Sequence, residues 1–208
     1  MACYVVLAPE PIRGIYDTWS TCEATVRGVR GAIYRKAADR ALAEQLLRGE
    51  GRKLEPGTYA FIDGNAAGGI GVVLVRRRPD GTTVTREIST TVLEVCQGLA
   101  PQDVERVRNP LAELAAVRAA LEVVRDGTAV TVVHDYEGTA PLIEGRWKAH
   151  DEAMRSTVDA CRFAVRERRL TVSFRYTNSH QSAVGDDEYA QCNARADALA
   201  RQAVEPKI

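Results

Sequence analysis

The sequence lacks the marks of several protein classes. Its five cysteines are odd in number, widely scattered and never in a Cys-x-x-Cys pair, so neither a disulfide framework nor a zinc site is indicated. No apolar run approaches the ~18 residues that a membrane-spanning helix needs, and the N-terminus has no basic segment followed by an apolar one. We therefore expect a cytoplasmic protein with reduced thiols, no membrane partner and no secretory signal.

The chain also has no excess of charge. Its 28 basic and 28 acidic residues cancel, and 45% hydrophobic with 27% charged residues is usual for a globular protein. Net charge therefore gives no indication of a polyanionic partner. A length of 208 residues is enough for one ordinary domain of ~150 residues and a small companion.

Residues 48–57 divide the chain, because glycines, a proline and charged residues follow one another there without periodicity. We read them as a linker between a small unit, 1–47, and a larger one, 58–208. The elements expected in the small unit are a strand over residues 3–7, a helix over 18–27, a short strand over 32–35 and a helix over 39–47. Ser20 with Glu23 has capping-box spacing, and Thr18 or Asp17 is an equally good first cap.

The larger unit begins with three apolar segments separated by turn residues, which favours an antiparallel meander. Its expected strands cover residues 59–63, 70–77, 83–89, 129–134 and 170–176, and its expected helices cover 111–125, 152–168 and 189–204. Asn109 with Pro110 has the pattern of a helix cap followed by proline at the first helical position. A meander followed by alternating helices and strands indicates an α/β domain with a mixed sheet.

Two carboxylates fall inside apolar segments. Asp63 interrupts the first strand of the meander, where an ionised carboxylate would lose hydration worth several kcal/mol unless a cation met it. The alternative for Asp63 is an Asx turn with Gly64. Glu113 falls in the first turn of the helix after Pro110, on the margin of its core-facing stripe; its alternative role is to favour the positive end of that helix.

Two further acids lie at element edges. Asp135 directly follows the apolar strand 129–134, and ligand sites of open α/β sheets gather at such strand ends. Asp197 lies at the edge of the buried side of the last helix. The alternative for Asp135 is that it merely ends a strand, and the alternative for Asp197 is that it is an ordinary solvated helix residue. Side chains in these four positions can converge from different elements.

The order of these acids resembles the type 1 ribonuclease H family. The matching segments are Tyr59-Ala-Phe-Ile-Asp-Gly-Asn65, Arg108-Asn-Pro-Leu-Ala-Glu-Leu114, His134-Asp-Tyr-Glu-Gly138 with Gly145-Arg-Trp-Lys-Ala149, and Asn193-Ala-Arg-Ala-Asp-Ala-Leu-Ala200. The third set resembles the compact bacterial branch, which carries an N-terminal, viroplasmin-like hybrid-binding domain. Residues 1–47 are similar to that domain in Tyr4-Val-Val6, Gly14-Ile-Tyr-Asp-Thr-Trp19, Val26-Arg-Gly28 and Gly31-Ala-Ile-Tyr-Arg-Lys36.

The resemblance implies a ribonuclease H-like mixed sheet, with three antiparallel strands followed by parallel ones, and a small N-terminal α/β domain. It also implies an endonuclease that cuts the RNA strand of RNA–DNA hybrids and leaves 5′-phosphate and 3′-hydroxyl ends. Asp63, Glu113, Asp135 and Asp197 then match the acids that hold two Mg²⁺ ions, with Mn²⁺ as the alternative ion. Such ions would supply the positive charge that Asp63 requires. No obligatory protein partner is inferred.

The resemblance further implies contacts with the hybrid. In the small unit these fall on Trp19, Tyr34, Arg35 and Lys36, as an aromatic and cationic surface, although a core position is the alternative for Trp19. In the larger unit the expected contacts are Gly64 and Asn65 beside Asp63, Asn109 beside the Glu113 turn, where pure capping is the alternative, and Trp147 with Lys148 on the DNA strand.

His180 resembles the family histidine in the loop before the last helix, which implies a part in product release or proton movement. Thirteen positions separate it from Asn193, more than the family's usual spacing, so the loop is extended or the helix starts earlier. Two other functions stay open at this point. One is a protein that binds hybrids or structured RNA without cutting, and the other is a nuclease of the same fold that acts on DNA.

Overall fold

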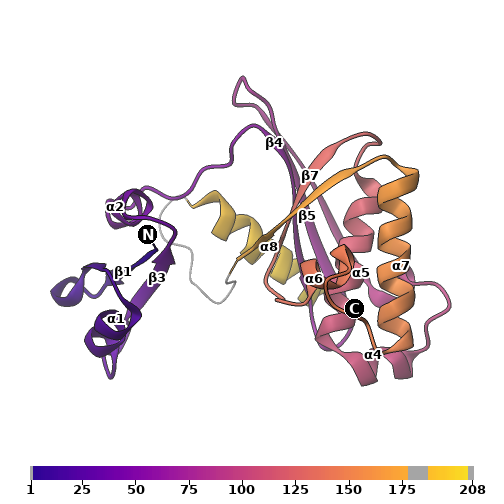
Figure 1. Ribbon diagram of the computed structural model, residues 1–208, viewed down its shortest axis with the longest axis horizontal. Helices are drawn as coiled ribbons and strands as arrows, with labels where there is room; N and C mark the ends of the chain where they lie inside the picture. Colours follow the sequence, from indigo (N-terminus) through magenta and orange to yellow (C-terminus); the bar gives the residue numbers. More distant parts are fainter. Residues whose placement is uncertain (1, 178–186, 206–208) are drawn as a thin grey trace. The chain divides into compact units, whose positions relative to one another are not determined.

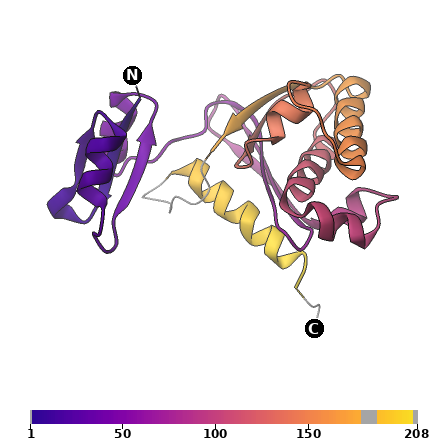
Figure 2. The ribbon, with the colours of Figure 1, turned by 60° about the horizontal axis from the view of Figure 1, so that its bottom comes forward.

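The computed structural model describes residues 2–177 and 187–205 (Figures 1 and 2). They form two compact units, one of residues 2–54 with 187–191 and the other of residues 55–177 with 192–205. That 1–47 and 58–208 are separate domains joined by a linker stays a prediction. Among the described residues, none of the helices combines the length and apolar character that crossing a membrane requires.

The first unit is a three-stranded antiparallel sheet in the order β2-β1-β3. Its elements are β1 (Cys3–Ala8), the 3-10 helix η1 (Glu10–Ile12), β2 (Gly14–Tyr16), α1 (Trp19–Val26), β3 (Ile33–Ala37) and α2 (Arg40–Leu47). Side chains of β1 alternate between two clusters, because successive strand residues point to opposite faces. Val5 packs with Leu46 of α2, and Val6 packs with Cys22 of α1.

The helix caps of the first unit decide between the cap residues that the sequence left open. The Thr18 hydroxyl accepts a hydrogen bond from the Thr21 N–H at 3.3 Å, so Thr18 is the N-cap of α1 and Ser20 lies inside the helix. Asp39 caps α2 in the same way, through the Leu42 N–H at 2.9 Å. The strand β2 is an addition to the expected elements.

The second unit is built on a five-stranded sheet in the order β6-β5-β4-β7-β8. The strands are β4 (Gly57–Gly64), β5 (Gly69–Arg77), β6 (Thr83–Thr91), β7 (Ala129–His134) and β8 (Thr171–Tyr176). The first three are antiparallel, whereas β7 pairs parallel to β4 and β8 pairs parallel to β7. The predicted mixed sheet is therefore confirmed.

Helices cover both faces of this sheet (Figures 1 and 2). Helices α5 (Asn109–Val123) and α7 (Glu152–Glu167) pack on one face, and α8 (Glu188–Gln202) runs along the other from Cys192 onward. Ten of the 15 residues of α5 are buried, Glu113 among them. The expected placement of Glu113 on the margin of the buried stripe was wrong, because α5 is enclosed on nearly all sides.

Glycines let α8 lie directly on β5. A Cβ atom at Gly71 would come within 1.9 Å of the Ala196 carbonyl oxygen, and one at Gly69 within 2.0 Å of the Ala200 carbonyl oxygen. Ser89 of β6 also donates a hydrogen bond to a backbone carbonyl of α8, that of Leu199, at 2.8 Å. Larger residues on β5 would push the helix away from the sheet.

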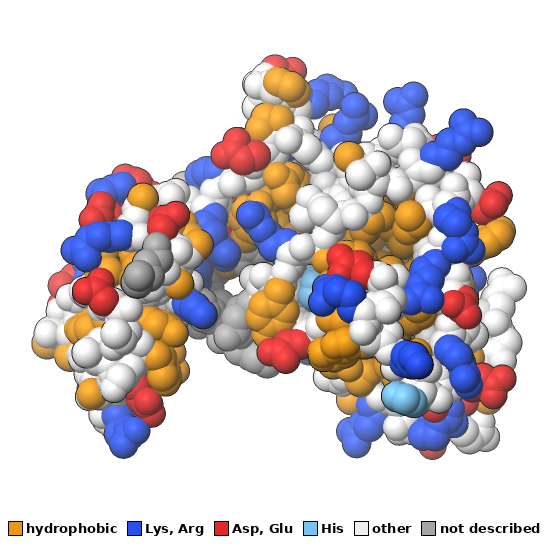
Figure 3. All heavy atoms as spheres, viewed as in Figure 1, with side chains coloured by type: hydrophobic (Ala, Val, Ile, Leu, Met, Phe, Trp, Pro, Cys, Tyr) orange, Lys and Arg blue, Asp and Glu red, His pale blue; other side chains and the backbone are white. Residues whose placement is uncertain are grey.

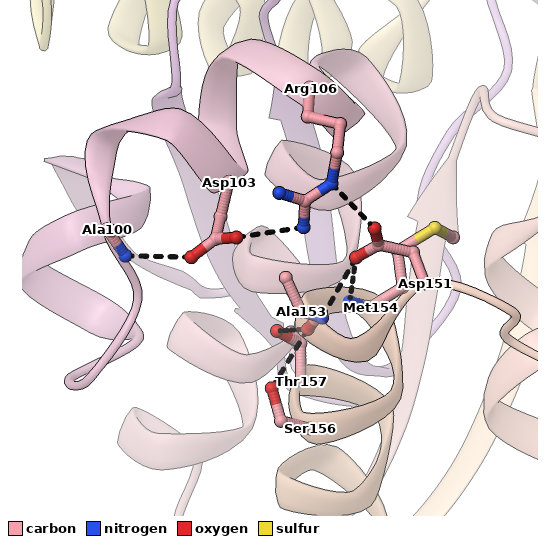
Figure 4. A network of polar contacts seen from close by, with 8 residues as sticks. All are labelled: Ala100, Asp103, Arg106, Asp151, Ala153, Met154, Ser156 and Thr157. Atoms are coloured by element: carbon pink, nitrogen blue, oxygen red, sulfur yellow. Dashed lines mark hydrogen bonds and ion pairs between the residues drawn. The ribbon is translucent and has the colours of Figure 1, made fainter.

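The structure adds three short helices that the sequence patterns do not predict: α3 (Val92–Val95), α4 (Pro101–Val107) and α6 (Thr139–Glu144). Figure 4 shows how polar contacts join α4 to the start of α7: the Arg106 guanidinium binds Asp103 at 2.8 Å and Asp151 at 2.9 Å. Asp151 also accepts the Ala153 N–H as the N-cap of α7. The hydrogen bond from the Ala100 N–H, followed by that from Arg106, lowers the pKa of Asp103, and the hydrogen bond from Arg106 is the main cause of the lowered pKa of Asp151.

The start of α5 differs from the expected cap. Asn109 is the first residue of the helix, and the N-cap position belongs to Arg108, whose side chain makes no capping hydrogen bond. Arg108 has a φ of 59°, a backbone conformation that few non-glycine residues adopt. The capping role considered for Asn109 is therefore wrong.

Candidate metal centre

Asp63 and Asp135 lie at the same edge of the sheet. Asp63 is the penultimate residue of β4, opposite Gly71 of β5, and Asp135 directly follows β7. Because β4 and β7 are parallel neighbours, their C-terminal ends meet at one edge. Asp63 is thus part of a paired strand, and the Asx-turn alternative does not describe it.

Glu113 reaches the same edge from α5. A Cβ atom at Gly64 would lie 2.5 Å from the Glu113 backbone nitrogen, so only glycine lets β4 approach the helix this closely. The Gly64 N–H donates a hydrogen bond to Glu113 Oε1 at 3.0 Å. The second oxygen, Oε2, is buried and has no hydrogen-bond partner among the described residues.

Asp63, Glu113 and Asp135 form one cluster. Each offers a carboxylate oxygen, and these three oxygens lie within 4.8 Å of one another. They come from three elements that are distant in sequence. Three like charges at this separation disfavour their own ionisation unless a cation joins them.

The acidity of the cluster follows from its surroundings. Burial, and then the charges of Asp135 and Asp197, raises the pKa of Asp63 to about 7, with Arg201 acting in the opposite direction. Burial, followed by repulsion from Asp135 and Asp63, raises the pKa of Glu113 well above its usual range. Without a counter-charge, protons would therefore occupy part of this cluster at neutral pH.

Asp197, the fourth predicted acid, comes from α8. Its Oδ2 atom pairs with Arg201 Nη2 at 2.7 Å, one helical turn away, and its side chain is half-buried. Asp197 is close enough to raise the pKa of Asp63, yet it is not one of the three residues whose oxygens lie within 4.8 Å. The structure thus brings three predicted acids together and places the fourth nearby.

The donor set fits a hard divalent cation. All three clustered ligands are carboxylates, which Mg²⁺ prefers over nitrogen or sulfur donors. The buried Oε2 atom of Glu113 also lacks a hydrogen-bond partner among the described residues, as expected for an oxygen that a cation would bind. Asp63, Glu113 and Asp135 are the residues that would hold such an ion.

Two neighbours of Asp135 had no expected role at this site. The Tyr136 hydroxyl has a raised pKa, first because it is partly buried and then because Glu113 is near. A Cβ atom at Gly138 would come within 2.5 Å of the Tyr136 ring, so glycine makes room for it. His134 is buried, and its Nδ1 lies 3.0 Å from the Tyr136 carbonyl oxygen. The run His134-Asp-Tyr-Glu-Gly138 was the sequence signal for both.

The other residues expected to contact substrate in this unit fall into two groups. Gly64 is buried, and the Asn65 amide is used within the fold: Oδ1 accepts the Gly69 N–H at 3.0 Å, and Nδ2 donates to the Ala200 carbonyl at 2.8 Å. Asn109, Trp147 and Lys148 are exposed, Trp147 by 51%. The exposed group is available to a ligand.

In the first unit, aromatic rings gather on the surface. Trp19 is 40% exposed and Tyr34 is 38% exposed, so Trp19 does not belong to the core. The Trp19 ring lies with its centroid 5.4 Å from that of Tyr34 and 5.4 Å from that of Tyr4. Lys36 of β3 is also exposed and, two residues from Tyr34, points to the same face.

Residues 3–47 match the family model of the ribonuclease H1 N-terminal domain. The first unit is therefore similar to that domain from Cys3 to Leu47. No curated protein matches the chain.

Solved structures resemble most of the chain. Ribonuclease H1 from the halophilic archaeon Halobacterium salinarum NRC-1 is 24% identical, with 71% of this chain and 96% of that chain covered and a TM-score of 0.48. LC11 ribonuclease H1, isolated from compost, is 21% identical, with 72% and 96% covered and a TM-score of 0.48. The prototype foamy virus protease–reverse transcriptase is 15% identical, with 76% and 22% covered and a TM-score of 0.51. This last likeness shows a shared fold.

Within the first unit, Arg35 lies away from the aromatic surface. Its side chain is 3% exposed and its Nη1 atom donates to Asp187 Oδ2 at 2.8 Å. Asp187 is fully buried and also binds Arg52 Nε at 3.0 Å. The expectation that Arg35 and Lys36 share one surface was wrong, because adjacent residues of a strand point to opposite faces.

His180 lies outside the described residues. Its expected part in product release or proton movement stays a prediction.

Proposed function

We propose that this protein hydrolyses the RNA strand of RNA–DNA hybrids at the cluster of Asp63, Glu113 and Asp135, with Asp197 as a fourth ligand. The observation that carries the proposal is the convergence of three carboxylate oxygens within 4.8 Å at one edge of the sheet. The match of residues 3–47 to the family model of the ribonuclease H1 N-terminal domain supports the choice of a hybrid as substrate.

The proposed cofactor is a pair of divalent cations, Mg²⁺ or, as the alternative, Mn²⁺. When bound, two such ions would stabilise the attacking and leaving oxygens of an in-line phosphoryl displacement, which gives 5′-phosphate and 3′-hydroxyl ends. The chain contributes the geometry. The Gly64 N–H fixes Glu113 Oε1, strand pairing fixes Asp63, and Arg201 holds Asp197 one turn away along α8.

Substrate binding is proposed to use exposed aromatic and basic side chains. In the first unit, the Trp19 and Tyr34 rings would pack on sugars while Lys36 contacts phosphate. In the second unit, Trp147 and Lys148 would contact the DNA strand. The segment between Asp135 and Trp147 is too short for a long basic insertion, so a tethered binding domain, present at an effective concentration of order mM, would strengthen the grip on substrate.

The test is incubation of the full chain with labelled RNA–DNA hybrid, double-stranded RNA and duplex DNA, each with Mg²⁺ and with chelator. We expect cutting of the RNA strand of the hybrid in Mg²⁺ alone. Asp63→Asn should abolish cutting and retain hybrid binding, whereas Asp159→Asn, at an exposed acid of α7, should leave both cutting and binding unchanged.

Other outcomes would support one of the two alternative functions or contradict the proposed site. A hybrid that is bound yet stays intact in every divalent cation would support the non-catalytic binding protein. Cutting of duplex DNA in preference to the hybrid would support a DNA nuclease. Equal loss of activity in the Asp63→Asn and Asp159→Asn variants would contradict the assignment of the site.

A further inference from the structure

A pocket separate from the carboxylate cluster lies at the other end of the same sheet. It is a pocket of about 550 Å³ beside the first residues of β4 and β7, whereas the carboxylate cluster lies where those strands end. The residues that line it include Leu74, Arg76, Val84, Arg86, Arg125 and Asp126. The proposed ribonuclease activity does not account for this pocket.

The register of the sheet explains the pocket. Arg76 pairs with Val84, and Leu74 pairs with Arg86, so these four side chains point to one face. Leu74 packs against the core beneath α5 on that face. Because α5 ends at Val123, the sheet extends beyond the helix there, and the overhang leaves a hollow with an apolar floor.

Three arginines surround the hollow. Arg76, Arg86 and Arg125 are all exposed, and none of them forms an ion pair with an acid among the described residues. Asp126, the acid of the lining, is paired with Arg168 at 2.7 Å. In Figure 3, Lys and Arg side chains gather along the upper edge of the second unit, where this end of the sheet lies.

The C-terminal end of α5 does not account for the presence of three arginines at the pocket. The carbonyl end of a helix attracts cations, which would give a guanidinium a role here without any ligand. Arg168 already has that role, because its Nη1 atom donates to the Leu121 carbonyl at 2.7 Å. The three positive charges at the pocket are therefore additional to those that the helix end uses.

We propose that this pocket binds a nucleotide, with its phosphate groups on Arg76, Arg86 and Arg125 and its base over Leu74 and Val84. Guanidinium groups match phosphate oxygens in a bidentate geometry. The volume falls in the range of ~300–1,000 Å³ typical of small-molecule sites, and such sites combine an apolar lining with a few polar groups. The nucleotide is either free or the 5′-phosphorylated end of a strand. The proposal does not depend on hydrolysis of hybrids.

The test is calorimetric titration of the full chain with ADP and with inorganic pyrophosphate in chelator, since chelation leaves the carboxylate cluster unable to hold a phosphate through a metal. We expect both probes to bind. The double variant Arg86→Ala with Arg125→Ala should weaken both by about tenfold or more, because each removed guanidinium ends a charge-assisted hydrogen bond.

Two control variants show whether the position of the charge matters. Arg78→Ala removes one guanidinium from an exposed residue near the pocket that does not line it, and Arg30→Ala removes one from an exposed residue of the first unit. We expect each to bind ADP as the native chain does, with an unchanged melting temperature. Equal weakening by Arg78→Ala would reduce the site to a diffuse positive surface, and loss of ADP binding in Arg30→Ala would move the site to the first unit; either result overturns the proposal.

Two further arms define the ligand. Val84→Thr keeps a β-branched residue in β6 and makes the floor polar, so it should weaken ADP several-fold and leave pyrophosphate unchanged. A 5′-phosphorylated dinucleotide, compared with its unphosphorylated form, distinguishes a strand end from a free nucleotide. Binding of either source, lost in the double arginine variant, supports the pocket; failure of ADP, pyrophosphate and the phosphorylated dinucleotide to bind refutes it.

Discussion

Each unit of this protein buries a group of charged side chains, and the two groups differ in their balance. In the first unit, buried Asp187 lies between Arg35 and Arg52 at 2.8 and 3.0 Å, so charge meets opposite charge. In the second unit, Asp63 and Glu113 share a small volume with Asp135, and like charge meets like. The first group pairs opposite charges within the chain, whereas we propose that the second binds divalent cations. Removing an acid from the first group should therefore destabilise the protein, whereas removing one from the second should stabilise it when no metal is bound.

The largest expected effect is on turnover. Asp63→Asn removes a charge from the like-charge cluster and should lower the rate of hybrid cutting by roughly 10³-fold or more, because the two-cation site would lose a ligand. Gel analysis of labelled hybrid in Mg²⁺ measures this. Asp187→Asn, at a residue outside the cluster, is the comparison, and a loss as great as that of Asp63→Asn would remove the distinction between the two groups.

The next effect is on stability. Asp187→Ala leaves the Arg35 guanidinium buried without its carboxylate, and breaking a buried pair in this way costs about 3–5 kcal/mol. Part of that loss belongs to the Ala190 N–H, which Asp187 also accepts at 3.0 Å. Denaturant unfolding of the full chain measures the change. In a double-mutant cycle with Arg35→Met, a coupling near zero would show that the pair contributes nothing.

A third effect concerns pH in metal-free protein. Folding raises the pKa of Asp63 from 3.8 to about 7, so the folded state binds more protons than the unfolded state between those values. This contribution to stability is present below pH 3.8 and is lost as pH rises through about 7. In chelator at pH 8, Asp63→Asn should therefore melt above the native chain, by roughly 2–4 °C for each kcal/mol of relieved repulsion. Mg²⁺ should raise the melting temperature of the native chain only.

That experiment has its own control at low pH. Near pH 4 the native Asp63 is protonated in the folded state, so the advantage of the Asn variant should disappear there. An advantage that stays constant from pH 4 to pH 8 would mean that the substitution acts through packing and not through charge.

The smallest effect is on the salt dependence of hybrid binding. Lys36→Ala should reduce the slope of log affinity against log salt by about one, because one phosphate contact is lost. Arg35→Met should leave the slope unchanged, since Arg35 is buried against Asp187. Equal slopes in the two variants would show that exposure does not determine which basic residue meets the phosphates. Binding titrations at several salt concentrations provide the measurement.

Sequence patterns predicted the second unit well where segments were long and apolar. The strand 129–134 was found at its observed bounds, and the meander was found with ends shifted by one or two residues. Short elements were missed: α3 has only four residues, although its Thr91–Glu94 capping box is a recognisable signal. Such brief segments carry too few residues for periodicity to be seen.

At the candidate site, the residue types and their order were available from the sequence, and the distances were not. The apolar run around Asp63 already required a partner of positive charge. The place of Arg35 could have been inferred from strand alternation with Lys36, but its acid, Asp187, lies 152 positions away and no local pattern indicates it. The separation of Asp197 from the other three acids depends on how α8 lies on β5.

The sequence by itself determined the alternation of apolar residues, the acids embedded in it and the mixed sheet that follows, because these depend on neighbours along the chain. Only the tertiary structure decided which charges meet. Gly64 admits α5 and Gly71 admits α8, and these close approaches bring the acids to one edge of the sheet. The end of α5 leaves three arginines around a hollow at the other edge. Such meetings depend on packing between elements remote in sequence, which no local pattern records.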